Sequence, residues 1–371
     1  MNSYRAGVEI GSELRSIDPE VVFLFASIHF TEMPALLEAV YDALESESVV
    51  LIGGTGDGFY ERTRVAAAGV SALALNSEGA VRWHIDKQMD LRADPKKATQ
   101  ACLERLNHAC RDQGPSLYFL MSGSRADTCA IAEALETHAQ APVVGGVAGD
   151  DYRLEKAFIF AGREVLDDAV AIVAVEGPLK FAIRLAQSME PVGPLGVITQ
   201  TSESAVERFD DVPARDFITN ALGKDLSLVE RGILCLRLLR EGEERGRLHS
   251  IEYSAEPESG AVQLMAEVQP GTRAQLCIAR SEELLEDVRD QSLALDSLDF
   301  EPIAGLLVSC AGRKKFLGSR IAEEVDLFGK TEVQALAGFP SFGEFAPLKL
   351  GKGYSETLFH NMTLVILIIG S

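Results

Sequence analysis

The sequence predicts an α/β fold with two domains, built from repeated strand-helix-strand units and carrying an insert of antiparallel strands in the C-terminal domain. Three observations support this: apolar runs without alternation, a recurring layout that ends in glycine, and a change of character after about residue 190. The length of 371 residues allows two or three packed units. Because unbroken apolar runs are typical of strands covered on both faces, we expect partly parallel sheets.

Three stretches share the layout of an apolar strand, a helix, a second apolar strand and a further strand. Copy by copy, the expected strands are 21–30, 49–60 and 66–75, then 116–125, 142–152 and 169–177, then 303–313, 333–345 and 359–370. The first strands end near Ser27, Ser122 and Ser309, and the second strands near Gly53, Gly145 and Gly338. This spacing matches a βαβ crossover. Chance resemblance among glycine-terminated apolar strands is the alternative.

The sequence between the second and third copies reads differently. Residues 196–222 predict a strand, a turn, another strand and a helix that begins near Pro213. Residues 232–239 and 260–279, with a charged turn after the first, are typical of antiparallel strands punctuated by Gly and Pro. A helix follows over 281–298, with Ser281 as its N-cap. We place the boundary and a hinge near 191–196, which gives domains at 1–195 and 196–371.

Charge excludes several classes of partner. The 35 Lys and Arg against 56 Asp and Glu give a net charge of −21, and no basic cluster offers a footprint for nucleic acid or an anionic membrane surface. The longest apolar run, Leu364 to Ile369, is far too short for a membrane helix, and the N-terminus has no apolar signal segment. We therefore expect a cytoplasmic protein without membrane insertion.

Cysteine and histidine usage predicts neither a disulfide scaffold nor a metal site. The six cysteines form no CxxC, and the six histidines show no metal-ligand spacing. Reduced thiols and the absence of any metal or cofactor are the expectation. No GxxxxGK[ST], HExxH or GxSxG motif is present.

The glycine-rich strand ends are the candidate ligand site, because open α/β sheets bind ligands at the carboxyl ends of their strands. A loop almost without side chains would let backbone N–H groups approach a ligand; its glycines are Gly53, Gly54, Gly56, Gly58, Gly145, Gly146, Gly149, Gly338 and Gly343. Tight turns are the alternative for any single loop. We expect the three loops to converge.

Each first strand also ends in groups that suit an anion. Ser27, Ser122 and Ser309 come just before expected helices, whose N-termini offer unpaired N–H groups. Arg125 and Arg313 follow in the second and third copies, where a guanidinium can hold a carboxylate through two hydrogen bonds. Helix capping and exposed ion pairs are the alternatives.

Five motifs together resemble one known family. In order they are LIGGTGDGFY, VITQTSESAVERFDDVPA, LLVSCAGRKKFLG, LAGFPSFGEF and FHNMTLVIL, and they resemble the FIST family (F-box and intracellular signal transduction proteins). The likeness covers nearly the whole chain, with an N-terminal FIST domain to about residue 195 and a C-terminal one after it. One departure is Phe59, where the family tends to carry an acid, although Asp57 is nearby.

The resemblance implies a sensory protein that binds a small ligand such as an amino acid and acts in signal transduction. No kinase, cyclase, chemotaxis or F-box segment is seen, so the output would come from a signalling protein partner. For an amino-acid ligand we expect the backbone N–H groups and an arginine to bind the carboxylate. The ammonium would be bound by one of the acids near the glycines, which are Asp57, Asp150, Asp151 and Glu344. Solvated loop acids are the alternative.

Two other functions remain open at this point. An enzyme would use a loop carboxylate or Cys310, whose thiol pKa we expect a helix dipole and Arg313 to lower. His29 or His360 would be its base if folding brought it close; an inert buried cysteine is the alternative. The HN-x-T likeness to the family keeps Asn361 among the candidate ligand-binding residues. A pure interaction scaffold is the third possibility.

Overall fold

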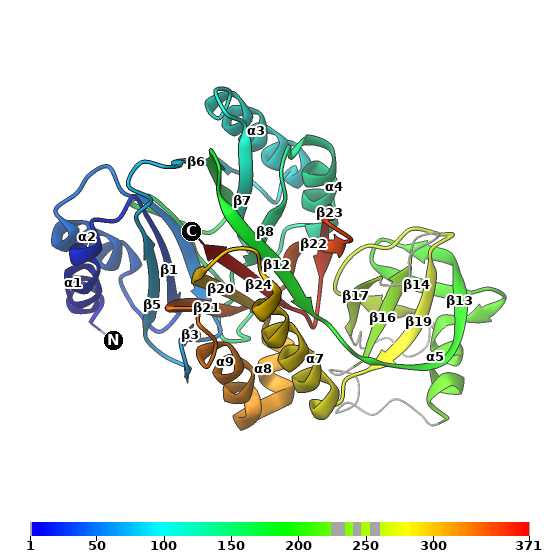
Figure 1. Cartoon of the computed structure of the whole chain (residues 1–371). Helices are drawn as coiled ribbons and strands as arrows, with labels where there is room; N and C mark the ends of the chain where they lie inside the picture. The colour runs from blue at the N-terminus through cyan, green and yellow to red at the C-terminus, as the bar shows by residue number, and fades with distance from the viewer. Residues whose placement is uncertain (1, 224–233, 240–245, 253–259, 371) are drawn as a thin grey trace.

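The computed structural model of the chain describes residues 2–223, 234–239, 246–252 and 260–370. Three mixed sheets form one body, and an antiparallel barrel stands beside it (Figure 1). Helices cover the outside of the body, so the α/β class predicted from the sequence is confirmed. No helix within these four stretches is both long and apolar enough to cross a membrane.

Each sheet of the body is built around a pair of parallel strands that comes from one copy of the repeat. The pairs are β1 (Val21–Ser27) with β2 (Val50–Gly56), β7 (Pro115–Ser122) with β8 (Val143–Val147), and β20 (Pro302–Cys310) with β21 (Ala335–Ser341). A third strand of the same copy runs antiparallel beside the first: β5 (Val70–Leu75), β11 (Ala169–Glu176) or β24 (Leu364–Gly370). The predicted repeat is therefore present in the fold.

The three copies exchange hairpins in a cycle. The hairpin of each copy pairs with the second parallel strand of another copy. The first-copy hairpin, β3 (Phe59–Glu61) with β4 (Arg64–Ala66), joins β21 of the third copy, and the second-copy hairpin, β9 (Ile159–Ala161) with β10 (Glu164–Leu166), joins β2 of the first. The third-copy hairpin, β22 (Glu344–Leu350) with β23 (Gly353–His360), joins β8 of the second copy. Two further strands, β6 (Arg82–Met89) and β12 (Lys180–Ala186), pair with β11 and β24. Residues from both halves of the chain thus share sheets.

Helices flank each parallel pair. One helix precedes the first strand of each copy: α1 (Ser3–Leu14), α3 (Pro95–Ala109) or α7 (Ser281–Leu293). The two parallel strands are joined by α2 (Met33–Leu44), by α4 (Thr128–His138), or by α8 (Ala311–Leu317) with α9 (Ile321–Gly329). Short 3₁₀ turns follow at Arg15–Ile17, Ala294–Ser297 and Gly318–Arg320.

The sequence reasoning did not identify α1, and its composition explains why. The helix buries Ser3, Gly7, Gly11 and Leu14, so its fully buried residues are mostly small. Those small residues let α1 approach α2 closely, because a Cβ at Gly7 would lie 2.4 Å from the Leu36 carbonyl oxygen. A search for runs of large apolar residues therefore overlooks this helix.

The described strands between residues 190 and 278 close an antiparallel barrel, the insert predicted from the sequence. Its order is β13 (Glu190–Ser202), β19 (Arg273–Ile278), β16 (Leu234–Leu239), β17 (Arg247–Glu252), β18 (Val262–Leu264) and β14 (Ala205–Phe209), and β14 pairs back with β13. The short β15 (Val212–Pro213) leads into α5 (Ala214–Leu222). Residues 240–245 of the expected charged turn lie outside the described residues.

The segment at 191–196, where we expected the boundary and hinge, lies inside β13. The pairing of β13 with β19 shifts its register between Val192 and Leu195, so the strand is irregular there. The barrel leaves and rejoins the body at neighbouring points, because Glu190 pairs with Ile278.

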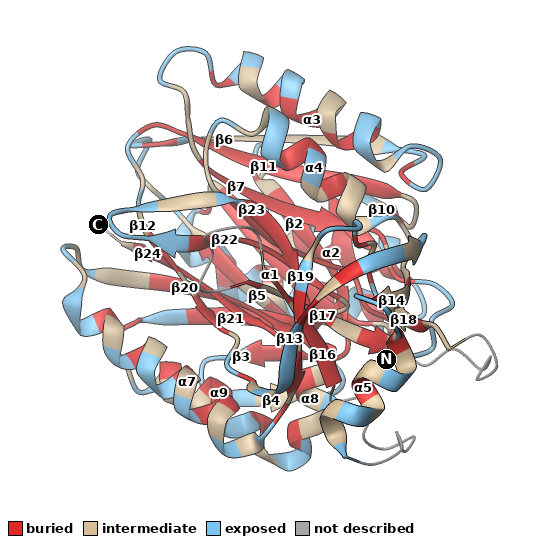
Figure 2. Ribbon diagram, turned by 90° about the vertical axis from the view of Figure 1, so that its right-hand side faces the viewer, coloured by how far each residue is buried: buried red, intermediate tan, exposed pale blue. Residues whose placement is uncertain are grey.

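The sheets pack on one another through aromatic rings. The Phe25 and Phe339 rings are stacked with centroids 4.6 Å apart, and the Phe119 ring lies 6.4 Å from Phe25. Figure 2 shows this burial on the strands of the body, while the helices present exposed residues outward. Burying each such ring stabilises the fold by roughly 1.5–3 kcal/mol. This packing brings the carboxyl ends of the parallel pairs together.

Each parallel pair contains one glycine at a point of close backbone approach. Gly53, Gly145 and Gly338 stand opposite Leu24, Leu120 and Leu307. A Cβ on the glycine would lie 1.8 Å from the leucine carbonyl oxygen in the first copy and 2.0 Å in the others. These glycines lie inside strands, together with Gly54, Gly56 and Gly146, so the expected loops begin later than we placed them.

Candidate functional site

The segments at the carboxyl ends of β2, β8 and β21 hydrogen-bond to one another in turn. The Gly149 N–H donates to Thr55 O at 2.8 Å, the Phe342 N–H to Val147 O at 3.1 Å, and the Asp57 N–H to Pro340 O at 3.1 Å. Each segment therefore contacts the other two, and the three strand ends lie together at one edge of the body.

A group of side chains, which we name the polar centre, gathers at this edge. It comprises Asp57, Tyr152, Cys310, Ser341 and Glu344, drawn from all three copies. The side chains of Ser341 and Glu344 are fully buried, and Asp57 is almost so. Tyr152 is 41% exposed, and its phenol lies close enough to Cys310, Asp57 and Glu344 for burial and their charges to raise its pKa. Tyr152 therefore lies between the buried groups and solvent.

Asp57 has an incompletely bonded carboxylate. Its Oδ1 accepts a hydrogen bond from the Asp151 N–H at 2.7 Å, whereas Oδ2 is buried and has no hydrogen-bond partner among the described residues. The Lys314 ammonium donates to the Asp57 backbone carbonyl. Burial raises the Asp57 pKa to about 6, against the opposing effects of the Asp151 N–H and Lys314. A buried oxygen without a partner costs about 1–3 kcal/mol.

Glu344 and Cys310 form the protonated part of the polar centre. Ser341 Oγ donates to Glu344 Oε1 at 2.6 Å, and the Thr363 N–H donates to Oε2 at 3.4 Å. Burial raises the pKa of Glu344 well above its ordinary value. A carboxylate and a neutral carboxyl in one cluster can bind a ligand that offers both donors and acceptors, or can relay a proton.

The expectation of a lowered thiol pKa at Cys310 is wrong. Burial raises this pKa well above its ordinary value, and the neighbouring Glu344 raises it further. Arg313 does not offset this effect, because its guanidinium is ion-paired with Glu324. A neutral thiol is a poor nucleophile, so the basis for choosing Cys310 as a catalytic group is removed.

Arg313 and Ser309 take part in a fully buried network behind the polar centre. Arg313 Nε donates to Glu324 Oε1 at 2.6 Å, and Ser309 Oγ donates to Glu324 Oε2 at 3.0 Å. The guanidinium also donates to the carbonyls of Met362 and Leu284 at 3.2 and 3.4 Å. Arg313 thus joins α7, α8, α9 and the turn before β24.

Three other candidates hydrogen-bond to backbone groups of the protein. Ser27 Oγ accepts from the Gly69 N–H at 3.0 Å, and Ser122 Oγ donates to Gly123 O at 3.0 Å. Arg125 is exposed and reaches Glu155 O at 3.5 Å. Ser27 lies three residues after Leu24, the leucine paired with Gly53, whereas Ser122 lies two residues after Leu120, the leucine paired with Gly145. The serines that the sequence aligned are therefore not all equivalent in space.

The loop at 150–156 is held in an unusual conformation by Asp150. Its buried carboxylate accepts N–H groups from Leu154, Glu155 and Lys156 at 2.7–2.9 Å. Asp151, Tyr152 and Leu154 have φ angles of 60°, 56° and 55°, which side-chain-bearing residues rarely adopt. Such strain persists only where the surroundings impose it, and it is common at functional sites.

Sequence reasoning missed Tyr152, Ser341 and Lys314 as members or neighbours of the polar centre. The Tyr152 ring lies 5.8 Å from the Phe342 ring, and Lys315 Nζ lies 5.1 Å from the Tyr152 ring centre. The position of Tyr152 directly after two aspartates was the one available signal. Nothing local indicated that α8 would bring its lysines to this loop.

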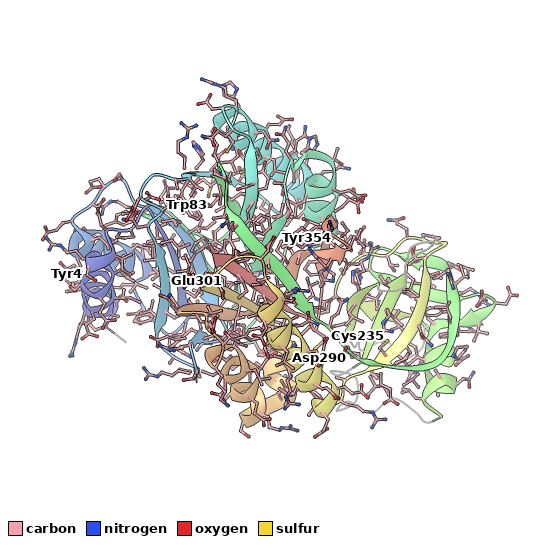
Figure 3. The ribbon with its side chains drawn as sticks, in the orientation of Figure 1. Tyr4, Trp83, Cys235, Asp290, Glu301 and Tyr354 are labelled. Atoms are coloured by element: carbon pink, nitrogen blue, oxygen red, sulfur yellow. The ribbon has the colours of Figure 1, made fainter. Side chains whose placement is uncertain are left out.

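The polar centre adjoins the barrel through Asn361. The Asn361 N–H donates to Leu248 O at 2.8 Å, and its Oδ1 accepts from the Ser250 N–H at 3.1 Å. Cys235, also at this junction (Figure 3), lies with its Sγ 3.6 Å from Ser250 Oγ. Two residues connect the polar centre to β17, because the Thr363 N–H donates to Glu344 Oε2 and Thr363 Oγ1 donates to the Asn361 carbonyl.

One group among the described residues has the donor types of a metal site. His84, Cys110 and Glu176 have ligating atoms within 4.8 Å of one another. However, the Arg82 guanidinium donates to Glu176 Oε2 at 2.9 Å, the same oxygen that His84 Nε2 contacts. A cation already occupies the carboxylate, so this group is better described as a hydrogen-bonded ion cluster than as a metal centre.

Comparison with known proteins agrees with the motifs. Residues 20–212 match the FIST N domain, and residues 201–347 match the FIST C domain. An uncharacterized protein of Methanocaldococcus jannaschii is 24% identical over 225 residues, which cover 57% of this chain and 43% of that protein. The matched region thus spans less than half the length of this relative. FIST domains are associated with signal transduction. Because the first match alone covers half of the chain, the protein belongs to the FIST family.

Proposed function

We propose that this protein is a sensor for a small polar metabolite, with an amino acid as the best-fitting class, and that the polar centre binds it. The observation that carries the proposal is the buried Oδ2 of Asp57, which lacks a hydrogen-bond partner among the described residues. An ammonium group would satisfy this oxygen and neutralise the charge. The association of FIST domains with signalling supports a sensory role over an enzymatic one.

Two further features support ligand binding here. The lysines Lys314 and Lys315 lie close to Asp57 and Tyr152 and supply positive charge for a ligand carboxylate. The strained loop that carries Tyr152 separates the buried groups from solvent and would have to move to admit a ligand. In this proposal Asp150 shapes the loop and Asp57 binds the ammonium.

The signal would leave through the barrel. Asn361 bonds both to β17 and to the turn that precedes β24, so a ligand that shifts this turn also shifts the barrel strand. We propose that a signalling protein partner reads this change, and that the N-terminal and C-terminal FIST segments contribute jointly to one site.

Titration calorimetry with the twenty amino acids tests the proposal. At pH 7.5 we expect one chemical class to bind with saturable heat, and we expect Asp57→Asn to weaken it at least tenfold. Because protonation removes the charge on Asp57, the affinity should fall about tenfold for each pH unit below about 6.

The matched control is Asp42→Asn, which removes an exposed acid on α2 and should leave binding unchanged. Flat thermograms for all twenty amino acids, or full binding by Asp57→Asn, would show that the polar centre is not an amino-acid site.

A further inference from the structure

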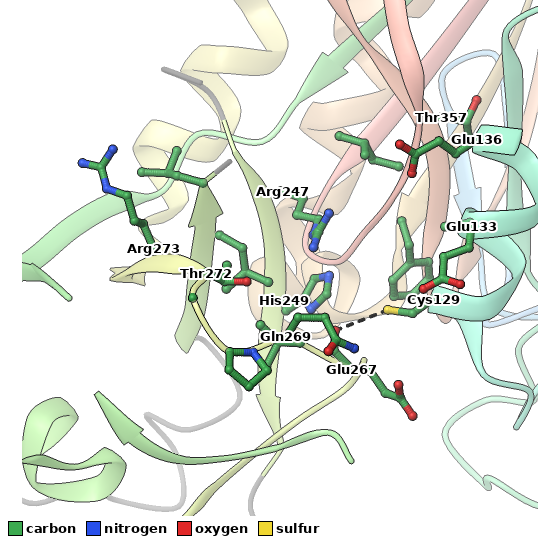
Figure 4. A pocket seen from close by; sticks show the side chains of 18 residues that line it. Cys129, Glu133, Glu136, Arg247, His249, Glu267, Gln269, Thr272, Arg273 and Thr357 are labelled. Carbon is green, nitrogen blue, oxygen red and sulfur yellow. Dashed lines mark hydrogen bonds between the residues drawn. The ribbon is translucent and has the colours of Figure 1, made fainter. Parts of the chain in front are cut away.

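A cavity of about 690 Å³ lies between the barrel and the body. One wall comes from α4 and β23, and the other from β16, β17 and residues 267–273. Figure 4 shows its lining, with His249 between Arg247 and Gln269 and with Glu133 and Glu136 projecting from α4. Its volume is within the range of small-molecule sites. The residues of the polar centre do not line it.

His249 is the unusual group in this lining. Its side chain is fully buried, and neither ring nitrogen has a hydrogen-bond partner in the described part of the chain. The ring packs edge-on against Phe359 at 6.1 Å. Burial lowers the His249 pKa to about 3, so the neutral ring offers one donor and one acceptor. Buried polar groups are almost always bonded, so this ring indicates a ligand with an amide-like group.

The end of the barrel wall that meets α4 favours positive charge. Glu267 lies there, because its backbone carbonyl accepts a hydrogen bond from Cys129 Sγ of α4 at 3.4 Å. Glu267 is surrounded by other acids, and the charge of Asp127, together with burial, Glu203 and Glu133, raises the Glu267 pKa. The negative charges around Glu267 that favour its protonation also favour the binding of a cation beside it. Glu133 is already ion-paired with Lys96 at 3.0 Å, and we choose Glu267 for the ammonium because the neighbouring acids crowd its carboxylate.

The far end of the barrel wall carries the opposite charge. Arg247 and Arg273 line the cavity, and Arg273 is exposed. Figure 4 places Arg273 and Glu136 on opposite sides of the pocket. Acidic and basic groups at opposite sides of one cavity are complementary to a molecule that carries both charges at separate ends.

We infer that this cavity binds a linear zwitterion whose charges lie several bonds apart, as in a dipeptide or tripeptide. Its ammonium contacts Glu267, its carboxylate contacts Arg273, and a peptide group meets His249. This site is separate from the one proposed for a single amino acid. A ligand here touches α4 and the barrel at once and therefore fixes the barrel relative to the body.

Titration calorimetry on the full chain tests the inference, with alanine, alanyl-alanine and trialanine as probes at pH 7.5. We expect at least one peptide to bind in a way that alanine does not compete with. Glu267→Gln and Arg273→Gln should each weaken the peptide at least tenfold. Both side chains reach solvent, so neither variant endangers folding. Glu38→Gln, an exposed acid on α2, is the control and should bind the peptide normally.

The Asp57→Asn variant separates the two sites. It should retain peptide binding even where it loses an amino acid. The inference is overturned if neither peptide gives saturable heat, if Glu267→Gln and Arg273→Gln bind like the wild type, or if Asp57→Asn abolishes peptide binding.

Discussion

At the scale of single residues, Asp57 illustrates a conflict between stability and function. Its side chain is buried, and one carboxylate oxygen has no hydrogen-bond partner among the described residues, so the ionised form is poorly solvated. A rise of the pKa from 3.8 to about 6 corresponds to up to about 3 kcal/mol of destabilisation once the group is ionised. Such a residue fits a ligand-binding role better than a structural one.

Asp57→Asn should therefore stabilise the unliganded protein above pH 6. Asparagine keeps the shape and can still accept from the Asp151 N–H, but it carries no charge. Because the folded pKa lies above the unfolded one, the wild type loses stability as the pH rises from about 4 to about 6. The variant lacks this loss. The difference in the free energy of unfolding between variant and wild type should therefore grow from zero near pH 4 to about 1–3 kcal/mol at pH 7.5.

Urea unfolding at several pH values measures this difference. Asp42→Asn is again the control and should show no pH-dependent gain. A variant that is less stable than the wild type at pH 7.5 would mean that Asp57 is bonded by a group that stabilises its charge.

At the scale of strands and helices, the shared glycines determine how close the parallel pairs lie. Gly145→Ala should destabilise the protein by about 3 kcal/mol, the upper end of the usual cost of overpacking, because the new Cβ would lie 2.0 Å from the Leu120 carbonyl oxygen and backbone cannot move aside cheaply. Gly353→Ala is the matched control: at this position φ is not positive, and the nearest atom is 3.9 Å away. Thermal unfolding of both variants checks this, and equal melting temperatures would contradict the steric explanation.

The strands and their repeat could be predicted because their apolar runs are local signals. The equivalence of Gly53, Gly145 and Gly338 was also visible as a pattern, although their place inside strands was not, since glycine marks both turns and close backbone contacts. The partner of Arg313 could not be predicted, because Glu324 lies on another helix and only folding brings them together. The same holds for Tyr152 and Cys310 in the polar centre.

At the scale of the whole molecule, the exchanged hairpins make the body one cooperative unit. The β3–β4 hairpin completes a sheet of the third copy, and β22–β23 completes a sheet of the second. No local signal in the sequence states which sheet a hairpin joins, so this feature lay beyond sequence reasoning. The polar centre depends on it, because Glu344 lies in β22 and pairs with Gly146 of β8.

This arrangement predicts which parts of the chain can be removed. Residues 1–195 alone should fail to fold cooperatively, because they lack the sheet that receives β3–β4 and the strands that cover β8. Replacing residues 190–278 with a short Gly-Ser linker should leave a folded body, because Glu190 and Ile278 are paired and their neighbours are already close.

Circular dichroism melts and size-exclusion chromatography distinguish the two cases. The barrel deletion should give one cooperative transition, at a lower temperature than the full chain because Leu248 no longer covers Asn361. The fragment 1–195 should give no sharp transition and should self-associate through its uncovered strand edges. A monomeric fragment with a sharp transition would mean that the N-terminal half pairs its own hairpins, and that the exchange between copies is not needed for folding.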